Sequence, residues 1–239
     1  IKVFKELEAK GHKGKGVRID SGDIAYLSKK TRKMLDEAGL DYVKIVASNS
    51  LDESIIRDLI MQGAQIDSFG VGERLITSKS EPVFGGVYKL SAVEENGKII
   101  PKIKISENVT KITNPSYKKV WRLFDNVSGK AVADVITLAD EVIDDSKPYT
   151  IFDPEQTYKK TTLTNFTAKL LQVKIFEKGK CIYNSPDIEE IKAYCKSQLG
   201  TIWDEVKRFE NPHEYYVDLS QPLWELKNRL LSEYFGYGE

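Results

Sequence analysis

Apolar and polar residues follow one pattern before about residue 80 and a different pattern after it. In the first part, short apolar runs at 16–20, 42–48 and 66–72 are separated by stretches with apolar residues at helical spacing. Strands that alternate with helices pair in parallel through right-handed crossovers. In the second part, apolar and polar residues alternate singly, which is typical of antiparallel strands with one face in solvent.

The helices between the first strands have recognisable ends. A helix is expected after Asp23 and ends near Gly39, where glycine is a common helix terminator. Ser50 and Glu53 fit a capping box at the start of a further helix, which stops at Gly63. We expect these two helices to bury the apolar residues Leu27, Met34, Leu35, Ala38, Ile55, Ile56, Leu59 and Ile60.

The second part of the chain begins with a hairpin signal, Asn96-Gly97, between alternating runs. A second pair of strands is expected to turn near Ser128-Gly129, and residues 144–156 are rich in turn formers and look like a linker. Two further strands are predicted within 166–183, a long helix at 185–209, and a final helix after Pro222.

These patterns predict an α/β protein. The parallel βα units fit either a doubly wound sheet or a βα barrel. We expect three regions: 1–80 with the βα units, 81–145 with antiparallel strands, and 146–239 as a C-terminal α/β region.

Composition excludes several classes of partner. Lys plus Arg equals Asp plus Glu at 36 each, so nothing favours a nucleic-acid or membrane-surface partner. No apolar run approaches the ~18 residues of a membrane span and no signal peptide is visible, so we expect a cytoplasmic protein. Cys181 and Cys195 cannot form a four-ligand zinc site, and His12 and His213 have no ligand at metal spacing, so no metal site is expected.

Polar residues and glycines gather where each of the three predicted parallel strands ends. Both candidate folds bind ligands at the carboxyl ends of such strands. We therefore expect a ligand site formed by three turns, Arg18 to Asp23, Ser48 to Asn49, and Gly70 to Gly72.

Arg18 and Asp20 stand two positions apart on a strand, so they share a face and can reach one ligand. The alternative for Arg18 is a buried salt bridge. Asp20 and Asp23 suit a metal pair or a clamp on ribose hydroxyls. They also suit a simple helix cap with a solvated neighbour.

Gly70 and Gly72 flank Val71 in a turn between a strand and a predicted helix. Glycines let a phosphate approach the backbone, and a helix start offers free N–H groups. Plain backbone geometry explains such a glycine pair as well. The third glycine of the dinucleotide fingerprint and the lysine of a P-loop are absent.

Four blocks, in this order, carry a family resemblance: "GVRIDSGDIAYLSKK", "IVASNSLDE", "IDSFGVGERLITS" and "GGVYKL". They resemble the bacterial nicotinate phosphoribosyltransferases, most densely over residues 1–145. The resemblance implies the C-terminal half of such an enzyme, with part of an irregular βα barrel followed by a β-rich region. It also implies formation of nicotinate mononucleotide and pyrophosphate from nicotinate and phosphoribosyl pyrophosphate in NAD biosynthesis. The implied cofactors are ATP, which is hydrolysed, and Mg²⁺.

The resemblance also implies residue roles. Arg18 is expected at the pyridine carboxylate or the nearby ribose, and Asp20 at the ribose hydroxyls; these two are the expected catalytic residues. The family is often dimeric, so we expect a homodimer in which residues just beyond the glycine turn reach the neighbour's ligand. The expected residues that bind substrate or phosphate are Asp23, Ser48, Asn49, Gly70, Val71, Gly72, Ser78 and Lys79.

Two departures from the family qualify these expectations. Glu73 stands where the family commonly has threonine, which makes direct phosphate contact by this residue doubtful. The family's phosphorylated histidine has no counterpart, since neither His12 nor His213 stands in a matching context. Because the chain also begins at Ile1 in a helical pattern, we expect a fragment that is inactive alone.

Three alternatives remain open. A nicotinamide phosphoribosyltransferase also uses an Arg-x-Asp turn and a glycine phosphate cradle. A βα-barrel aldolase or isomerase would share the glycine turn, with Lys44 as its Schiff-base lysine. Finally, the chain could be a non-catalytic structural partner for the rest of the enzyme.

Overall fold

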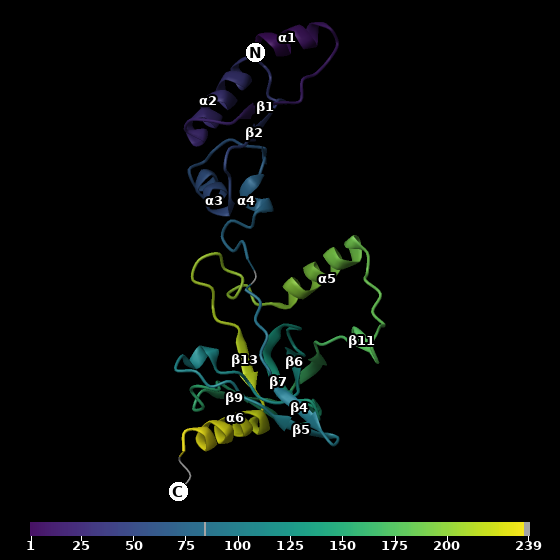
Figure 1. Ribbon diagram of the computed structural model, residues 1–239. Helices are drawn as coiled ribbons and strands as arrows, with labels where there is room; N and C mark the ends of the chain where they lie inside the picture. The colour runs from purple at the N-terminus through teal and green to yellow at the C-terminus, as the bar shows by residue number, and fades with distance from the viewer. Residues whose placement is uncertain (84, 237–239) are drawn as a thin grey trace. The chain divides into compact units, whose positions relative to one another are not determined.

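The computed structural model describes residues 1–83 and 85–236, without the side chain of Thr110. The chain divides into two compact units, Ile1–Val87 and Tyr88–Glu239 (Figure 1). Both contain helices and strands, which confirms the α/β class. The finer division into 1–80, 81–145 and 146–239 stays a prediction. Within the described residues, no helix combines the length and the apolar character needed to cross a membrane.

The N-terminal unit alternates helices with strands, as the apolar pattern predicts. Strands β1, β2 and β3 form a parallel sheet with β2 in the centre, which confirms the predicted pairing. In chain order the elements are α1 (Lys2–Ala9), β1 (Gly16–Ile19), α2 (Ile24–Glu37), β2 (Lys44–Ala47), α3 (Glu53–Met61), β3 (Ser68–Phe69) and α4 (Glu73–Ile76).

The central strand β2 supplies the core of this unit. Ile45 packs in one buried cluster and Ala47 in a second, each with residues of the flanking helices. Leu35 of α2 and Leu59 of α3 are buried as predicted. The prediction was wrong for their neighbours Met34 and Ile60, which are exposed, because adjacent residues on a helix point about 100° apart.

The two main helices of this unit begin at aspartates. Asp23 precedes α2 and accepts a 2.9 Å hydrogen bond from the Tyr26 backbone N–H. Asp52 precedes α3 with extended backbone and caps it in the same way. The predicted capping box of Ser50 and Glu53 was therefore wrong. Ser50 lies outside the helix with φ 45°, and Asp52 takes the capping position.

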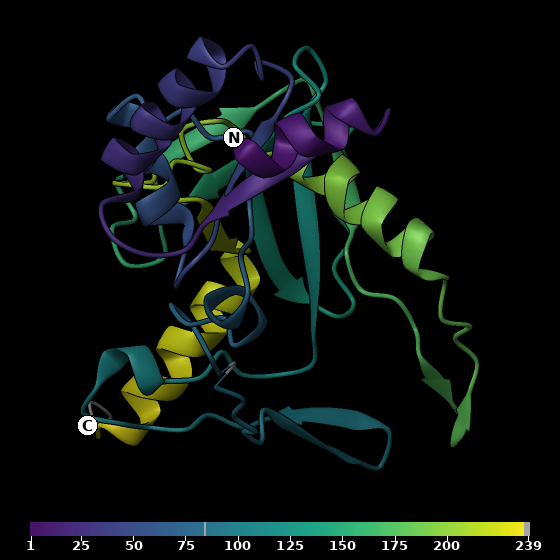
Figure 2. The ribbon, with the colours of Figure 1, turned by 90° about the horizontal axis from the view of Figure 1, so that it is seen from above.

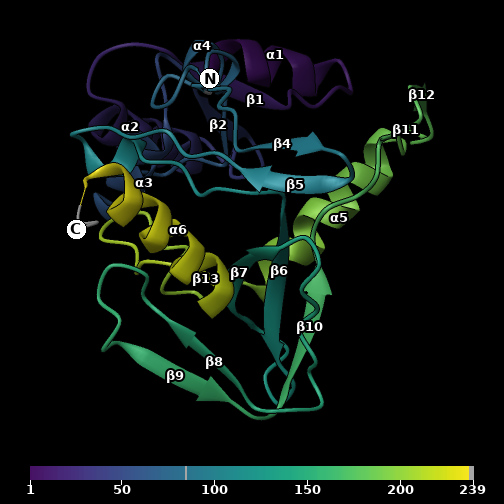
Figure 3. The same cartoon turned by 60° about the horizontal axis from the view of Figure 1, so that its bottom comes forward.

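The C-terminal unit is built on a four-stranded sheet in the order β10-β6-β7-β13 (Figure 3). Its predicted hairpins are confirmed at Asn96-Gly97, between β4 and β5, and near Ser128-Gly129, between β6 and β7. The strands are β4 (Ala92–Glu95), β5 (Lys98–Pro101), β6 (Lys118–Asp125), β7 (Ala131–Leu138), β8 (Tyr149–Phe152), β9 (Lys160–Leu163), β10 (Phe166–Leu170), β11 (Phe176–Glu177), β12 (Lys180–Cys181) and β13 (Tyr216–Leu219). The helices are the 3₁₀ helix η1 (Val109–Lys111), α5 (Ile188–Thr201) and α6 (Gln221–Tyr234).

Two parts of this unit differ from the sequence prediction. Residues 144–156 are not a linker, because β8 lies within them and buries Ile151 and Phe152. The short strand β13 was missed, and it pairs in parallel with β7 at the sheet edge. The helix α5 ends at Thr201, well before residue 209. Figure 2 shows it running outward from the four-stranded sheet, and Lys130 of the β6–β7 hairpin donates a 2.9 Å hydrogen bond to the Gly200 carbonyl in its last turn.

A buried ion pair crosses the sheet of the C-terminal unit. Arg122 of β6 donates to both carboxylate oxygens of Asp134 on β7, at 2.8 and 2.9 Å. The Tyr215 hydroxyl donates to the same carboxylate at 2.9 Å. Because Asp134 is buried, these donors compensate the desolvation of its charge.

Candidate functional site

The carboxyl ends of β1, β2 and β3 bring three of the predicted residues side by side. In the sheet register Ile19 is opposite Ala47, and Ala47 is opposite Phe69. The next residues along the three strands are Asp20, Ser48 and Gly70. The turns that follow β1, β2 and β3 therefore lie at the same edge of the sheet, as predicted.

Backbone and side-chain contacts join these three residues. The Ser48 N–H donates to the Ile19 carbonyl at 3.0 Å, and the Gly70 N–H donates to the Ala47 carbonyl at 2.7 Å. The Ser48 hydroxyl donates to Asp20 Oδ1 at 2.9 Å. A Cβ atom on Gly70 would lie 3.4 Å from the Ser48 Cβ, at the near limit of ordinary contact.

Arg18 and Asp20 form an open pair at this edge. The Arg18 Nη2 lies 3.4 Å from Asp20 Oδ2, and the two side chains are 66% and 50% exposed. The alternative of a buried salt bridge is therefore wrong. An exposed pair contributes only about 0–1 kcal/mol to folding, so stability does not explain these residues. Both groups remain accessible to a ligand.

Asp23 has a different role from Asp20. Its carboxylate caps α2 through the Tyr26 N–H, so the cap alternative accounts for Asp23. The alternative of a metal pair formed by Asp20 and Asp23 stays a prediction. Among residues 1–83 and 85–236, no group of three or more His, Cys, Asp or Glu side chains could hold a metal ion.

The turn after β2 has a strained backbone. Asn49 has φ 95° and Ser50 has φ 45°, so two consecutive residues other than glycine adopt left-handed conformations. Such conformations cost about 1 kcal/mol or more each, and they concentrate at functional sites. The strained residues Asn49 and Ser50 thus form the turn between Ser48, at the end of β2, and Asp52, which caps α3.

The glycine turn connects β3 to α4. Val71 packs against the buried cluster that contains Ala47, while Gly72 is the N-cap of α4 and has no side-chain capping bond. A Cβ atom on Gly72 would meet no atom within 4 Å, so open space lies above the backbone there. Because α4 has only four residues, its dipole is small. A phosphate held here would gain little from that dipole, and the backbone N–H groups of the turn are the nearest donors.

Lys44 does not fit the Schiff-base alternative. Its ammonium lies 2.9 Å from Asp67 Oδ1, and its side chain is exposed. A Schiff-base lysine needs a neutral amine, which an apolar site favours and a carboxylate partner opposes.

Ser78 and Lys79 follow α4 in an exposed turn, in which Ser78 has φ 46°. His12 and His213 are exposed loop residues, as predicted.

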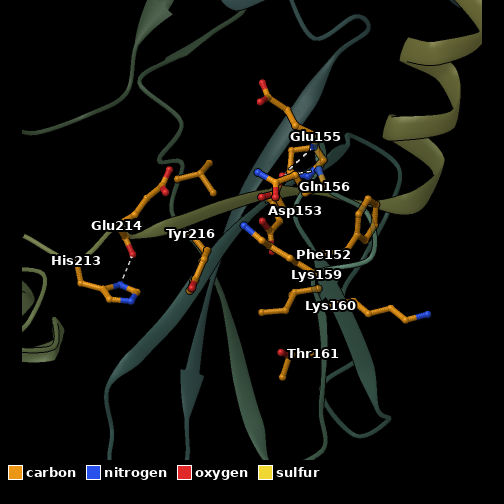
Figure 4. Close-up of a pocket in the computed structure, with 14 residues that line it drawn as sticks. Phe152, Asp153, Glu155, Gln156, Lys159, Lys160, Thr161, His213, Glu214 and Tyr216 are labelled. Atoms are coloured by element: carbon orange, nitrogen blue, oxygen red, sulfur yellow. Dashed lines mark hydrogen bonds between the residues drawn. The ribbon is translucent and has the colours of Figure 1, made fainter.

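Sequence reasoning missed a hollow of about 890 Å³ in the C-terminal unit. It is lined by residues of β8, β9 and β13 and of the segments next to them. Figure 4 shows Glu155 and Lys160 on one side of it, and His213 and Glu214 on the other. Its lining comes from segments far apart in the chain, so no motif could reveal it.

Asp218 is the most buried charged residue in the lining of this hollow. The residue is 4% exposed, and burial together with the nearby Asp153 raises the pKa of its carboxyl group to about 6. Asp153 itself accepts hydrogen bonds from the backbone N–H groups of Glu155 and Gln156, which lower its pKa.

Comparison with known proteins gives consistent matches. Residues 117–227 match the model of the nicotinate phosphoribosyltransferase C-terminal domain. The chain is 47% identical over 218 residues to nicotinate phosphoribosyltransferase of Bacillus subtilis (strain 168), covering 91% of this chain and 44% of that protein. It is 34% identical over 245 residues to the Dictyostelium discoideum enzyme of the same name, covering 96% of this chain and 41% of that protein.

A solved structure supports the same relationship. The crystal structure of human nicotinic acid phosphoribosyltransferase matches with a TM-score of 0.71 and 27% identity, over 96% of this chain and 42% of that one. The chain thus spans less than half the length of these relatives. The resemblance seen in the sequence is confirmed, and we identify the chain as a homologue of the nicotinate phosphoribosyltransferases that carries their C-terminal domain at residues 117–227.

Proposed function

We propose that the full-length protein to which this chain corresponds is a nicotinate phosphoribosyltransferase of NAD biosynthesis. It joins nicotinate to phosphoribosyl pyrophosphate, forming nicotinate mononucleotide and pyrophosphate. The observation that carries this proposal is the 47% identity to the Bacillus subtilis enzyme over 91% of the chain.

In this proposal the N-terminal unit holds the ribose and the 5′-phosphate. Arg18 binds the pyridine carboxylate or the nearby ribose, since a guanidinium matches a carboxylate with two hydrogen bonds. Asp20 accepts hydrogen bonds from the ribose hydroxyls, oriented by the Ser48 hydroxyl. The backbone from Gly70 to Gly72 receives the phosphate, while Val71 anchors that turn in the core.

The chemical step exchanges one bond for another at the ribose. The pyridine nitrogen forms a bond to the anomeric carbon as the bond from that carbon to the pyrophosphate oxygen breaks. Positive charge develops on the ribose during the exchange. A carboxylate at the position of Asp20 stabilises that charge, which supports its assignment as catalytic, whereas the cationic Arg18 contributes by holding the pyridine carboxylate.

ATP and Mg²⁺ belong to this proposal as cofactors of the full-length enzyme, on the family resemblance alone. Mg²⁺ would neutralise pyrophosphate charge, and ATP hydrolysis would drive the reaction. Among the described residues, no group of three or more His, Cys, Asp or Glu side chains is suited to a metal ion, and we assign no protein ligand for Mg²⁺ within this chain.

Several finer features are proposed on the same basis. Residues 1–80 form the C-terminal part of an irregular βα barrel, 81–145 an antiparallel β region and 146–239 a C-terminal α/β region. The enzyme is a cytoplasmic homodimer, in which Asp23, Asn49, Ser78 and Lys79 also belong to the substrate site. The parallel β1-β2-β3 sheet supports the barrel, because it has the strand pairing that a βα barrel requires.

The test is an assay of the full-length protein with phosphoribosyl pyrophosphate, Mg²⁺ and ATP. Nicotinate and nicotinamide are supplied in parallel reactions, and each mononucleotide product is quantified. We expect nicotinate mononucleotide as the main product. Nicotinamide mononucleotide as the main product would establish the nicotinamide alternative, and neither product would contradict the proposal. The isolated 239-residue chain should form no product.

A further inference from the structure

The turns after β2 and β3 are joined by a pair of charged side chains. Asp52 follows the strained turn at Asn49, and Arg74 stands two positions after Gly72. Arg74 Nη1 donates a hydrogen bond to Asp52 Oδ2. Both side chains are 23% exposed, so the pair is shielded from most of the solvent.

The Asp52 carboxylate serves two partners at once. Its Oδ1 accepts the 2.9 Å hydrogen bond from the Ile55 N–H that caps α3, while Oδ2 receives Arg74. The Ile55 N–H first, and Arg74 in addition, lower the pKa of Asp52. The carboxylate is therefore charged at neutral pH and fixed to the start of α3.

The short helix α4 depends on such contacts for its position. With four residues it has no stability of its own, and Gly72 provides no side-chain cap. On the strand side, the turn is held by the Gly70 N–H on Ala47 and by the packing of Val71. On the helix side, Arg74 ties it to α3.

We propose that Asp52 and Arg74 are positioning residues, which hold the Gly70–Gly72 turn in the geometry that receives the ligand's phosphate. The identity of that ligand rests on the proposed function, whereas the ordering of the turn does not. The competing role is direct contact between Arg74 and the phosphate. The two roles predict different effects of replacing Asp52. If Arg74 positions the turn through Asp52, the replacement weakens phosphate binding; if Arg74 contacts the phosphate directly, the replacement leaves it unchanged.

The first test uses steady-state kinetics of the complete enzyme. Asparagine caps a helix about as well as aspartate, so Asp52→Asn removes mainly the charge that holds Arg74. We expect Asp52→Asn and Arg74→Ala each to raise the KM for phosphoribosyl pyrophosphate about tenfold, with the KM for nicotinate changed less than about threefold. The double variant should be no worse than Arg74→Ala, since residues that act as one unit are not additive.

A matched control is Glu37→Gln, which neutralises the acid of the exposed Lys33–Glu37 pair on α2. It should leave both KM values unchanged. A loss with Arg74→Ala but not with Asp52→Asn would overturn the positioning role in favour of direct phosphate contact. Equal changes in the KM values of both substrates would also contradict it.

A second measurement is independent of turnover. Hydrogen exchange of the ligand-free complete protein should become at least about fivefold faster in peptides covering 69–76 in both variants, but not in Glu37→Gln. If the wild-type protein makes no mononucleotide, the proposed function fails. The hydrogen-exchange rates of 69–76 still test the positioning role in that case. Unchanged exchange in 69–76 would overturn the positioning role.

Discussion

Ser48 donates a 2.9 Å hydrogen bond from its hydroxyl group to Asp20 Oδ1, which links the carboxyl ends of β2 and β1. The Asp20 carboxylate lies within reach of Arg18 through its other oxygen and remains half exposed. A carboxylate held from two sides, yet open to solvent, is preorganised to accept hydrogen bonds from a ligand. This arrangement distinguishes Asp20 from Asp23, whose carboxylate caps a helix.

Asp20→Ala in the complete enzyme should lower kcat/KM by about 100-fold or more, because the ribose loses its acceptor in the transition state. The melting temperature should barely change, since the exposed side chain contributes little to folding. Steady-state kinetics and thermal unfolding measure the two effects. Near-normal activity with a lower melting temperature would mean that Asp20 is only a structural residue.

Arg18→Lys should weaken nicotinate and nicotinate mononucleotide alike, each by about tenfold. Lysine keeps the charge and loses the two-pronged hydrogen bonding to a carboxylate. Calorimetric titration of the complete enzyme with both ligands gives the affinities. An unchanged affinity for nicotinate would contradict the proposed contact between Arg18 and the pyridine carboxylate.

Asp218→Asn should stabilise the C-terminal unit at pH 7 and not at pH 4. The folded-state pKa of Asp218 is raised to about 6, so the folded state holds a proton that the unfolded chain releases. Stability is therefore lost as pH rises from the unfolded value, about 4, through the folded value.

The amide should restore about 3 kcal/mol of unfolding free energy at pH 7, as judged from the size of the shift. Denaturant unfolding of the chain at the two pH values measures the difference. A gain of equal size at pH 4 would show that ionisation of Asp218 is not the cause.

Tyr215→Phe should lower the free energy of unfolding by about 1–2 kcal/mol, because the buried Asp134 loses one of its donors. The adjacent exposed residue offers a matched control, and Tyr216→Phe should change stability by less than about 0.5 kcal/mol. Equal losses in the two variants would contradict the role of the Tyr215 hydroxyl.

Local periodicity predicts much of the N-terminal unit. Its strands are apolar runs bounded by turns, and parallel pairing fixes which ends lie together. The closeness of Asp20, Ser48 and Gly70 follows from that pairing alone. The helix start at Asp52 was missed because two residues near it can each serve as a cap, and the backbone of Ser50 decides between them.

The C-terminal unit is harder to predict from its sequence. Strand β13 has four residues and gains its place only by pairing with β7, a contact between distant segments. The hollow beside Asp218 depends on the same kind of contact, since Asp153 comes from another part of the chain. The local pattern of apolar and polar residues carries no information about contacts between segments that are distant in the chain.

Calorimetric titration of Gly72→Val in the complete enzyme tests the central claim, that the β3 turn receives the 5′-phosphate. Gly72 has φ −122° and ψ −103°, a backbone conformation that valine disfavours, and open space lies above it, so valine both strains the turn and fills the volume that a phosphate needs. We expect the affinity for nicotinate mononucleotide to fall about 30-fold or more and that for nicotinate to change less than about threefold. Equal losses for both ligands, or no loss for the mononucleotide, would contradict a phosphate site at Gly70–Gly72.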